Sequence, residues 1–198
     1  MKKQLASICI LATATLTSIS THAEEAPEWN YVEGSIEMLS LDGAGSLDPL
    51  GFGLSGSYLV TDNIFVDGSY NRLSDDAGGV DWDLTTLDLN IGYRYGVTKS
   101  TDVYASLGYL SFDVDTRSRF GSGGGNDDGY AVKIGTRSRL TDQFEVDLYA
   151  YQERFDDYSD NKFGLSGHYY LNDEFAIGAA IETDGDNEQT SLSVRYMF

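Results

Sequence analysis

The chain has 198 residues, of which 41% are hydrophobic and 13% aromatic, and its 32 acidic against 13 Lys and Arg residues give a formal net charge of −19. Because phosphate contacts require a basic surface and no run of Lys or Arg occurs, this acidity argues against a nucleic-acid-binding protein. The 14 Tyr and 9 Phe argue against a disordered chain, and the length suits a single domain.

The N-terminal segment has the layout of a secretory signal peptide. Two lysines precede an apolar stretch, 5–16, and a polar segment then leads to Ala23. The stretch is shorter than the ~20 apolar residues that a membrane-spanning helix needs. We therefore predict a cleaved signal peptide, 1–23, and a mature domain, 24–198. Cleavage would change the net charge from −19 to −21 and remove the only cysteine, Cys9, so that no disulfide or thiolate metal site could form.

The rest of the chain alternates apolar and polar residues with a period of two, which is typical of β-strands with one apolar face. Between residues 85 and 95, for example, Leu87, Leu89 and Ile91 alternate with Asp88. No part of the mature domain has the apolar stripe of a helix. The same alternation, in places looser, covers 30–38, 50–60, 64–70, 130–140, 144–150, 163–171, 175–181 and 190–198.

Short turns and long polar segments separate the strands alternately, and together they predict ten strands with both domain ends on the side of the turns. The turns are Val60-Thr61-Asp62, Val97-Thr98-Lys99, Leu140-Thr141-Asp142 and Leu171-Asn172-Asp173. The segments rich in Gly, Asp, Asn and Ser are predicted to be five long loops, at about 41–49, 74–83, 113–129, 155–161 and 183–188.

The apolar face could fill a soluble sandwich or a lipocalin-like barrel, or it could point outward into lipid. Small residues such as Gly53, Ser55, Gly92 and Gly135 dominate the opposite face, which suits a crowded lumen better than a solvated surface. A sheet in hydrocarbon must close, because each unpaired backbone group there is costly. We therefore predict an all-β fold, a closed antiparallel up-and-down transmembrane β-barrel, with ten strands favoured and eight as the alternative.

Tyrosines on the apolar faces predict an aromatic girdle at each end of the barrel. Those near the turns are Tyr58, Tyr93, Tyr95, Tyr169 and Tyr196, and those near the long loops are Tyr70, Tyr109 and Tyr130.

The last stretch, from Thr190 to Phe198, alternates apolar residues and ends in Phe, with Tyr196 two positions earlier. It resembles the terminal strand of bacterial outer-membrane β-barrel proteins. With the signal peptide, residues 24–198 resemble the small outer-membrane β-barrel domain family, broadly OmpA/OmpX-like and porin-like, except that the commonest small barrels have eight strands.

The resemblance implies a Gram-negative outer-membrane location, with acidic loops outside, termini in the periplasm, and lipid and lipopolysaccharide as surroundings. It also implies that Tyr196 and Phe198 form an assembly signal for the barrel-assembly machinery, with periplasmic chaperones acting during biogenesis. We expect a monomer.

Charged residues on the inward face are predicted to form a paired network, because charges in a lumen are tolerated only with partners. Such a network would close the lumen and leave a structural or cell-surface interaction role. The alternative is a narrow passive pore for small hydrophilic solutes, which the small lining residues favour and the bulk of Tyr104, Tyr149, Tyr151 and Tyr170 opposes. The predicted network is Asp67, Asp88, Arg94, Lys133, Arg137, Glu145, Asp147 and Arg195.

Catalysis is not predicted. His168, the only histidine of the mature domain, faces inward near a short turn and is expected to form hydrogen bonds in the lumen, and no nucleophile elbow or phosphate loop accompanies it. No cofactor is expected. The acidic loops suit solvation, with divalent-cation binding as a weaker hypothesis whose candidate ligands are Asp184, Asp186 and Glu188.

Overall fold

The computed structural model describes residues 25–41, 48–77, 79–156 and 158–198. The predicted signal peptide and part of the first predicted loop, 42–47, lie outside the described residues. Within the described ranges, no helix is long and apolar enough to cross a membrane. The strands are β1 (Tyr31–Ser40), β2 (Leu50–Leu59), β3 (Ile64–Ala77), β4 (Val80–Gly96), β5 (Thr101–Ser118), β6 (Gly121–Thr141), β7 (Phe144–Arg154), β8 (Ser159–Tyr170), β9 (Phe175–Thr183) and β10 (Glu188–Met197).

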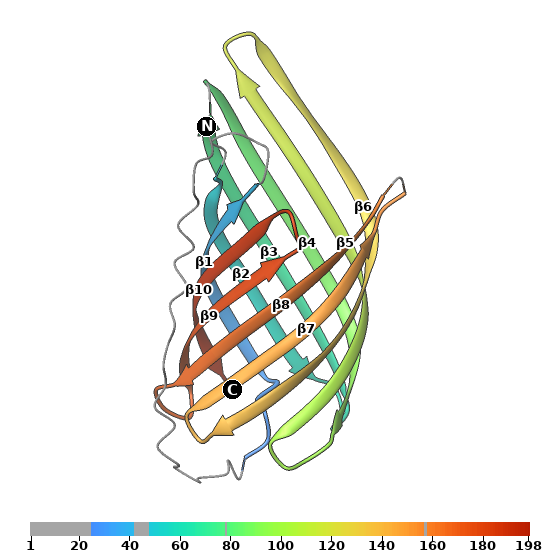
Figure 1. The fold of residues 1–198 in the computed structure, drawn as a ribbon, viewed down its shortest axis with the longest axis vertical. Helices are drawn as coiled ribbons and strands as arrows, with labels where there is room; N and C mark the ends of the chain where they lie inside the picture. Colours follow the sequence, from blue (N-terminus) through green and yellow to red (C-terminus); the bar gives the residue numbers. More distant parts are fainter. Residues whose placement is uncertain (1–24, 42–47, 78, 157) are drawn as a thin grey trace, which may run out of the picture.

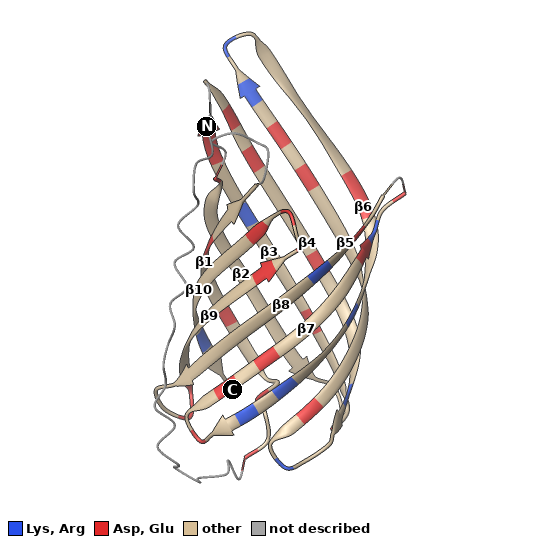
Figure 2. Ribbon diagram, in the orientation of Figure 1, with Lys and Arg blue, Asp and Glu red and all other residues tan. Residues whose placement is uncertain are grey.

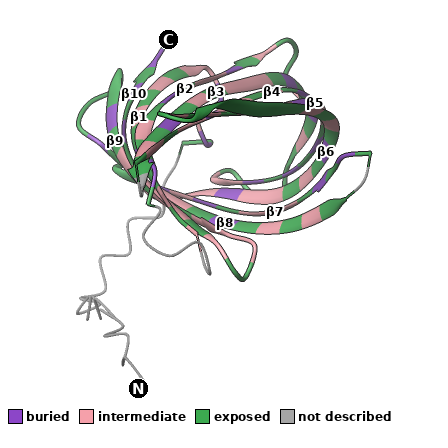
Figure 3. Ribbon diagram, turned by 90° about the horizontal axis from the view of Figure 1, so that it is seen from above, coloured by how far each residue is buried: buried purple, intermediate pink, exposed green. Residues whose placement is uncertain are grey.

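Each strand pairs antiparallel with the strands before and after it, and β1 closes the ring against β10 (Figures 1 and 3). The closing register runs from Tyr31 opposite Met197 to Ser40 opposite Glu188. The prediction of a closed up-and-down barrel with ten strands is confirmed. We call the end with the four short turns the turn end, and the opposite end the hairpin end.

The apolar faces point outward, as predicted. Leu89 and Ile91 are 54% and 58% exposed, whereas Asn90 between them is 8% exposed. Figure 3 shows this alternation of exposed and buried residues around the ring. All eight tyrosines of the predicted girdles are also exposed on the outside of the barrel. A surface of this kind is stable against hydrocarbon, because the barrel leaves no backbone edge within it.

The short turns share one hydrogen-bonding device, which explains the repeated sequence pattern. Thr61 Oγ1 accepts hydrogen bonds from the backbone N–H groups of Asn63 and Ile64, and Asn172 Oδ1 accepts them from Glu174 and Phe175. In each motif, the side-chain oxygen of the residue at the second position therefore accepts hydrogen bonds from backbone N–H groups of the turn. The four predicted turns are confirmed.

Two of the predicted long loops are wrong. Segment 74–83 belongs to β3 and β4, which pair as far as Ala77 opposite Val80, and 113–129 belongs to β5 and β6, which pair as far as Ser118 opposite Gly121. Beyond the membrane both faces of a hairpin meet water, so its strands need no apolar face and have the composition of a loop. Gly79, with φ of 80°, supplies the positive φ at the tip of the β3–β4 hairpin.

The hairpin end is therefore uneven, and the β5–β6 hairpin projects farthest (Figure 1). Strands β3 to β6 continue as a sheet beyond their neighbours, since β7 pairs with β6 only from Tyr130 onward. Acidic residues follow the projecting strands, and Arg117 and Arg119 lie near the tip (Figure 2).

Candidate functional site

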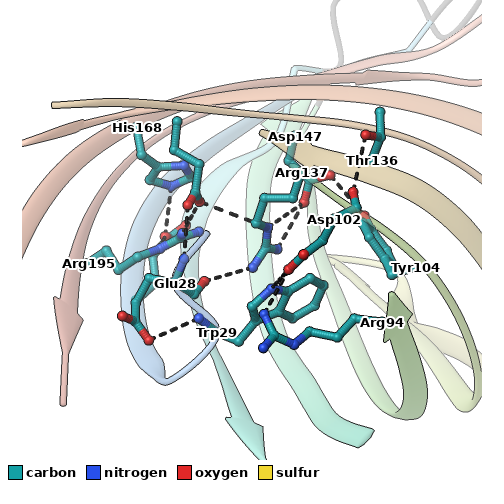
Figure 4. A network of polar contacts seen from close by, with 12 residues as sticks. Glu28, Trp29, Arg94, Asp102, Tyr104, Thr136, Arg137, Asp147, His168 and Arg195 are labelled. Carbon is teal, nitrogen blue, oxygen red and sulfur yellow. Dashed lines mark hydrogen bonds and ion pairs between the residues drawn. The ribbon is translucent and has the colours of Figure 1, made fainter. Parts of the chain in front are cut away.

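A network of buried charges fills the lumen near the turn end (Figure 4). Arg137 on β6 donates from Nε and Nη2 to Asp147 Oδ2, at 3.1 and 2.9 Å, and from Nη1 to the backbone oxygen of Glu28, at 3.1 Å. The pairing register places Arg137 directly opposite Asp147. Both side chains are 8% exposed. Breaking such a desolvated pair leaves a buried charge without compensation, so the network favours a closed, rigid lumen.

Glu145 connects this arginine to a second one, Arg195, which also binds Glu33. Arg195 on β10 donates to Glu33 Oε2 at 2.6 Å and to Glu145 Oε1 at 3.3 Å, and Arg137 Nε lies 3.9 Å from the same Glu145 oxygen. His168 Nε2 lies 2.9 Å from Glu33 Oε2. The expected hydrogen-bonding role of His168 in the lumen is thus confirmed.

Trp29, which precedes β1, fills the lumen beside these charges. It is 2% exposed, and its indole N–H donates to Asp102 Oδ2 at 2.8 Å, an oxygen that also accepts from Arg94 Nη1. The ring centroids of Phe65 and Tyr104 lie 4.5 and 5.3 Å from the indole. We call Trp29, Phe65 and Tyr104 the Trp29 plug, because these aromatic rings obstruct the turn end of the lumen.

A polar chamber of about 280 Å³ occupies the lumen above the plug. Lys133 lies there with its ammonium 5.2 Å from the ring centroid of Tyr149 and 5.4 Å from that of Tyr151. Lys162 pairs with Glu153 at 2.9 Å.

An apolar cluster lies in the lumen toward the hairpin end, which the sequence did not lead us to expect. Leu73, Leu84, Leu110 and Phe155 are inward and at most 9% exposed, and they border a second cavity of about 290 Å³. Leu73, Leu84 and Leu110 occupy inward positions of β3, β4 and β5, and Phe155 directly follows β7. We call these four residues the leucine cluster. Bulky side chains thus project into the lumen toward both of its ends.

The structure distributes the eight predicted network residues over two groups. Those near the turn end form the ion pairs above, together with Glu33: Arg94, Arg137, Glu145, Asp147 and Arg195. Asp67, Asp88 and Lys133 line the chamber, as do Arg137, Asp147 and Arg195, but form none of these ion pairs. There Asn90 Nδ2 donates to Asp67 Oδ1 at 2.8 Å and also to Asp88.

Sequence reasoning missed several lumen residues. Asp102 and Glu182 stand at inward positions that alternation predicts, in line with Tyr104 and Ala180, and could have been found by extending the strands. Trp29 could not have been found in this way, because it lies outside every segment that alternates apolar and polar residues.

The three candidate cation ligands do not converge. Asp184 Oδ1 accepts from the N–H groups of Asp186 and Asn187, at 2.9 and 2.7 Å, so this carboxylate closes the β9–β10 turn. Burial raises its pKa, but hydrogen bonds from Asn187 and Asp186 outweigh this, and the pKa of Asp184 lies below its usual value. Among the described residues, no three Asp, Glu, His or Cys side chains are arranged to hold a metal ion.

Tyr196 and Phe198 lie on the outer surface at the turn end. Phe198 is 59% exposed, and its ring centroid lies 6.4 Å from those of Tyr58 and Tyr196. The two residues of the predicted assembly signal are therefore accessible beside the β1–β10 seam.

An outward apolar surface, a closed ring of strands and a charged lumen define a transmembrane β-barrel protein. The family model of the outer membrane protein beta-barrel domain matches residues 9–198. The chain belongs to this family and is an outer-membrane protein.

Solved structures show the same fold at low sequence identity. The attachment invasion locus protein Ail of Yersinia pestis, solved with the heparin analogue sucrose octasulfate, has 17% identity and a TM-score of 0.50, covering 86% of this chain and 97% of that one. The NanC porin has 8% identity and a TM-score of 0.52, covering 84% and 100%. No curated protein matches the chain.

Proposed function

We propose that this protein is a cell-surface interaction protein, in which the barrel anchors a sheet that projects from the outer face of the outer membrane. One observation carries the proposal: β3 to β6 continue past their neighbours, and in the described residues Gly121–Asp128 of β6 pairs with β5 alone. A free strand edge presents backbone donors and acceptors to a partner strand. The glycines at 121, 123, 124 and 125 leave this edge unobstructed by side chains.

The obstructed lumen supports a surface role over transport. The Trp29 plug lies toward one end and the leucine cluster toward the other. The buried ion pairs of Arg137 and Arg195 link neighbouring strands of the barrel wall. Ail, the attachment invasion locus protein, has the same fold, which agrees with this proposal.

The orientation and biogenesis form part of the same proposal. The turn end faces the periplasm, and the acidic hairpins lie outside among lipopolysaccharide. Tyr196 and Phe198 are presented to the assembly machinery, periplasmic chaperones escort the unfolded chain, and the barrel is a monomer.

A hairpin-shortened variant tests the surface role. Asp113–Asn126 is replaced by Asn-Gly, so that Phe112 and Asp127, which already pair, flank a two-residue turn. Host cells displaying the native protein or the variant are compared for attachment to cultured epithelial cells and to immobilised matrix proteins. We expect attachment above empty cells for the native protein and its loss for the variant. Equal attachment by the two displays, or none by the native protein, would refute the proposal.

The second candidate is a narrow passive pore, favoured by the polar chamber and by the shared fold with a porin. Planar-bilayer recordings separate the two candidates. The surface role predicts no stepwise current from the native protein, whereas reproducible steps would favour the pore.

A further inference from the structure

The chamber contains more negative charge than its cations neutralise. Seven carboxylates line it, against four Lys and Arg side chains. Three of these cations hold carboxylates: Arg137, Arg195 and Lys162. Among the described residues, Lys133 has no carboxylate within 4 Å, and its contacts are with two tyrosine rings. A formal surplus of three negative charges therefore remains inside the barrel.

Four carboxylates carry this surplus, and in the described part of the chain their hydrogen bonds come from neutral groups. Ser35 and Gln189 donate to Glu37, Asn90 donates to Asp67 and Asp88, and Tyr149 and Tyr151 donate to Glu182, the last at 2.6 Å. Glu37 is 7% exposed and the other three are half-buried, so a mobile cation would stabilise these carboxylates, because desolvation without a counter-charge is costly.

Two buried polar atoms beside these carboxylates have no partner among the described residues. Ser57 and His168 both line the chamber and are 5% and 3% exposed, yet Ser57 Oγ and His168 Nδ1 form no hydrogen bond. When His168 is neutral and donates from Nε2 to Glu33, its Nδ1 is an acceptor. The chamber thus offers open acceptors as well as negative charge, and a ligand with N–H donors satisfies both.

The arrangement selects against a single metal ion. The carboxylates stand on four different strands, with Glu37 on β1, Asp67 on β3, Asp88 on β4 and Glu182 on β9, and no metal-holding group of three exists among the described residues. A cation whose charges are spaced along a chain fits such separated carboxylates better than one compact ion.

The protein itself shows how an alkylammonium is accommodated. Lys133 and Lys162 place their ammonium groups 5.4 and 5.5 Å from the ring centroid of Tyr151, within the range of cation–π attraction. The tyrosine rings also offer an apolar face to methylene groups. The chamber volume, about 280 Å³, lies near the lower end of the range for small-ligand sites.

We propose that the chamber is a binding site for a linear alkyl polyammonium ion, a diamine or polyamine, whose ammonium groups pair with Glu37, Asp67, Asp88 and Glu182. The acidic hairpins raise the local concentration of such cations at the outer mouth.

Equilibrium dialysis with labelled spermidine tests this proposal. The full-length barrel is refolded in non-ionic detergent at ~0.15 M salt with spermidine present, so that the obstructed ends do not prevent entry. We expect about one spermidine per barrel, and less when 1,4-diaminobutane, but not Mg²⁺ at equal charge, is also present during refolding. Absence of stoichiometric binding, or an equal reduction by Mg²⁺, would overturn the proposal.

Two matched double variants locate the site. Glu37→Gln with Glu182→Gln removes two charges from the chamber. Asp75→Asn with Asp81→Asn removes two charges from the β3–β4 hairpin. We expect at least a tenfold loss of spermidine affinity for the first pair and less than a twofold change for the second. Equal losses would mean general charge attraction and refute the site.

Lys133→Met provides a measurement that does not depend on the folding of the first double variant. Removing the resident ammonium leaves the chamber more negative, so we expect at least a threefold gain in spermidine affinity. Unchanged or weaker binding by the folded Lys133→Met barrel would contradict the proposal.

Discussion

At the residue scale, the stability of the barrel depends on a few arginines that the lumen desolvates. Arg137 holds three groups at once: the Asp147 carboxylate, the backbone oxygen of Glu28, and the face of Trp29, whose ring centroid lies 4.1 Å from the guanidinium. Each of these contacts uses a different part of the planar guanidinium fork, a geometry that Lys does not reproduce.

Arg137→Gln is therefore expected to lower the free energy of unfolding by about 3–5 kcal/mol, because Asp147 would be left buried without its counter-charge. Urea unfolding in lipid vesicles, followed by tryptophan fluorescence, measures the loss. The matched control is Arg72→Gln, which breaks the exposed pair with Asp83, whose side chains are 51% and 39% exposed, and should cost about 0–1 kcal/mol. Similar losses for the two variants would show that the lumen is not a desolvated environment.

Glycine also has an identifiable role at one inward position. A Cβ at Gly92 would lie 2.2 Å from Phe65 Cζ, and Phe65 is fixed by its contact with Trp29. Gly92→Ala is expected to destabilise the barrel by about 1–3 kcal/mol through overpacking. Gly34→Ala, where a Cβ meets nothing within 4 Å, should change stability by no more than ~0.5 kcal/mol. The same unfolding assay compares the two variants. An unchanged free energy of unfolding for Gly92→Ala would mean that Phe65 can shift to make room for the added methyl group.

At the element scale, each projecting hairpin has a part that forms the barrel wall and a part that extends beyond it. The hairpin-shortened variant, lacking Asp113–Asn126, removes only paired strands whose two faces meet water. We expect it to fold and to retain a shift in electrophoretic mobility between unboiled and boiled samples in SDS. If the shortened chain runs as unfolded in both samples, the projecting strands contribute to the barrel itself.

This division also explains which elements the sequence could reveal. Residues 85–95 alternate because one face meets lipid and the other the lumen, so their strand was predictable. Segments 74–83 and 113–129 have the composition of loops, yet they pair as strands, because backbone hydrogen bonds and a turn glycine suffice where both faces are solvated. The inward charges followed from the same alternation, whereas Trp29 and the partners of each charge depend on contacts between residues distant in sequence.

At the scale of the whole molecule, the barrel encloses a lumen in which Trp29, which precedes β1, packs against Phe65 and Tyr104 of the wall. Trp29→Ala would remove the indole that packs against Phe65 and Tyr104 and binds Asp102, at a cost of about 3–5 kcal/mol. We also expect the variant to pass small cations in a planar bilayer more often than the native protein. Trp82→Ala, on the projecting part of β4, serves as the control and should leave the conductance unchanged. A Trp29→Ala barrel that stays silent would place the main obstruction at the leucine cluster.

The seam between β1 and β10 joins the first and last strands of the barrel, and Phe198 N–H donates to the backbone oxygen of Asn30. These two strands are far apart in the sequence, so the ring can close only once β10 has been made. A chain that stops before β10 would carry two open edges, which hydrocarbon does not tolerate. Insertion of a closed barrel into the bilayer thus requires that β10 is already present.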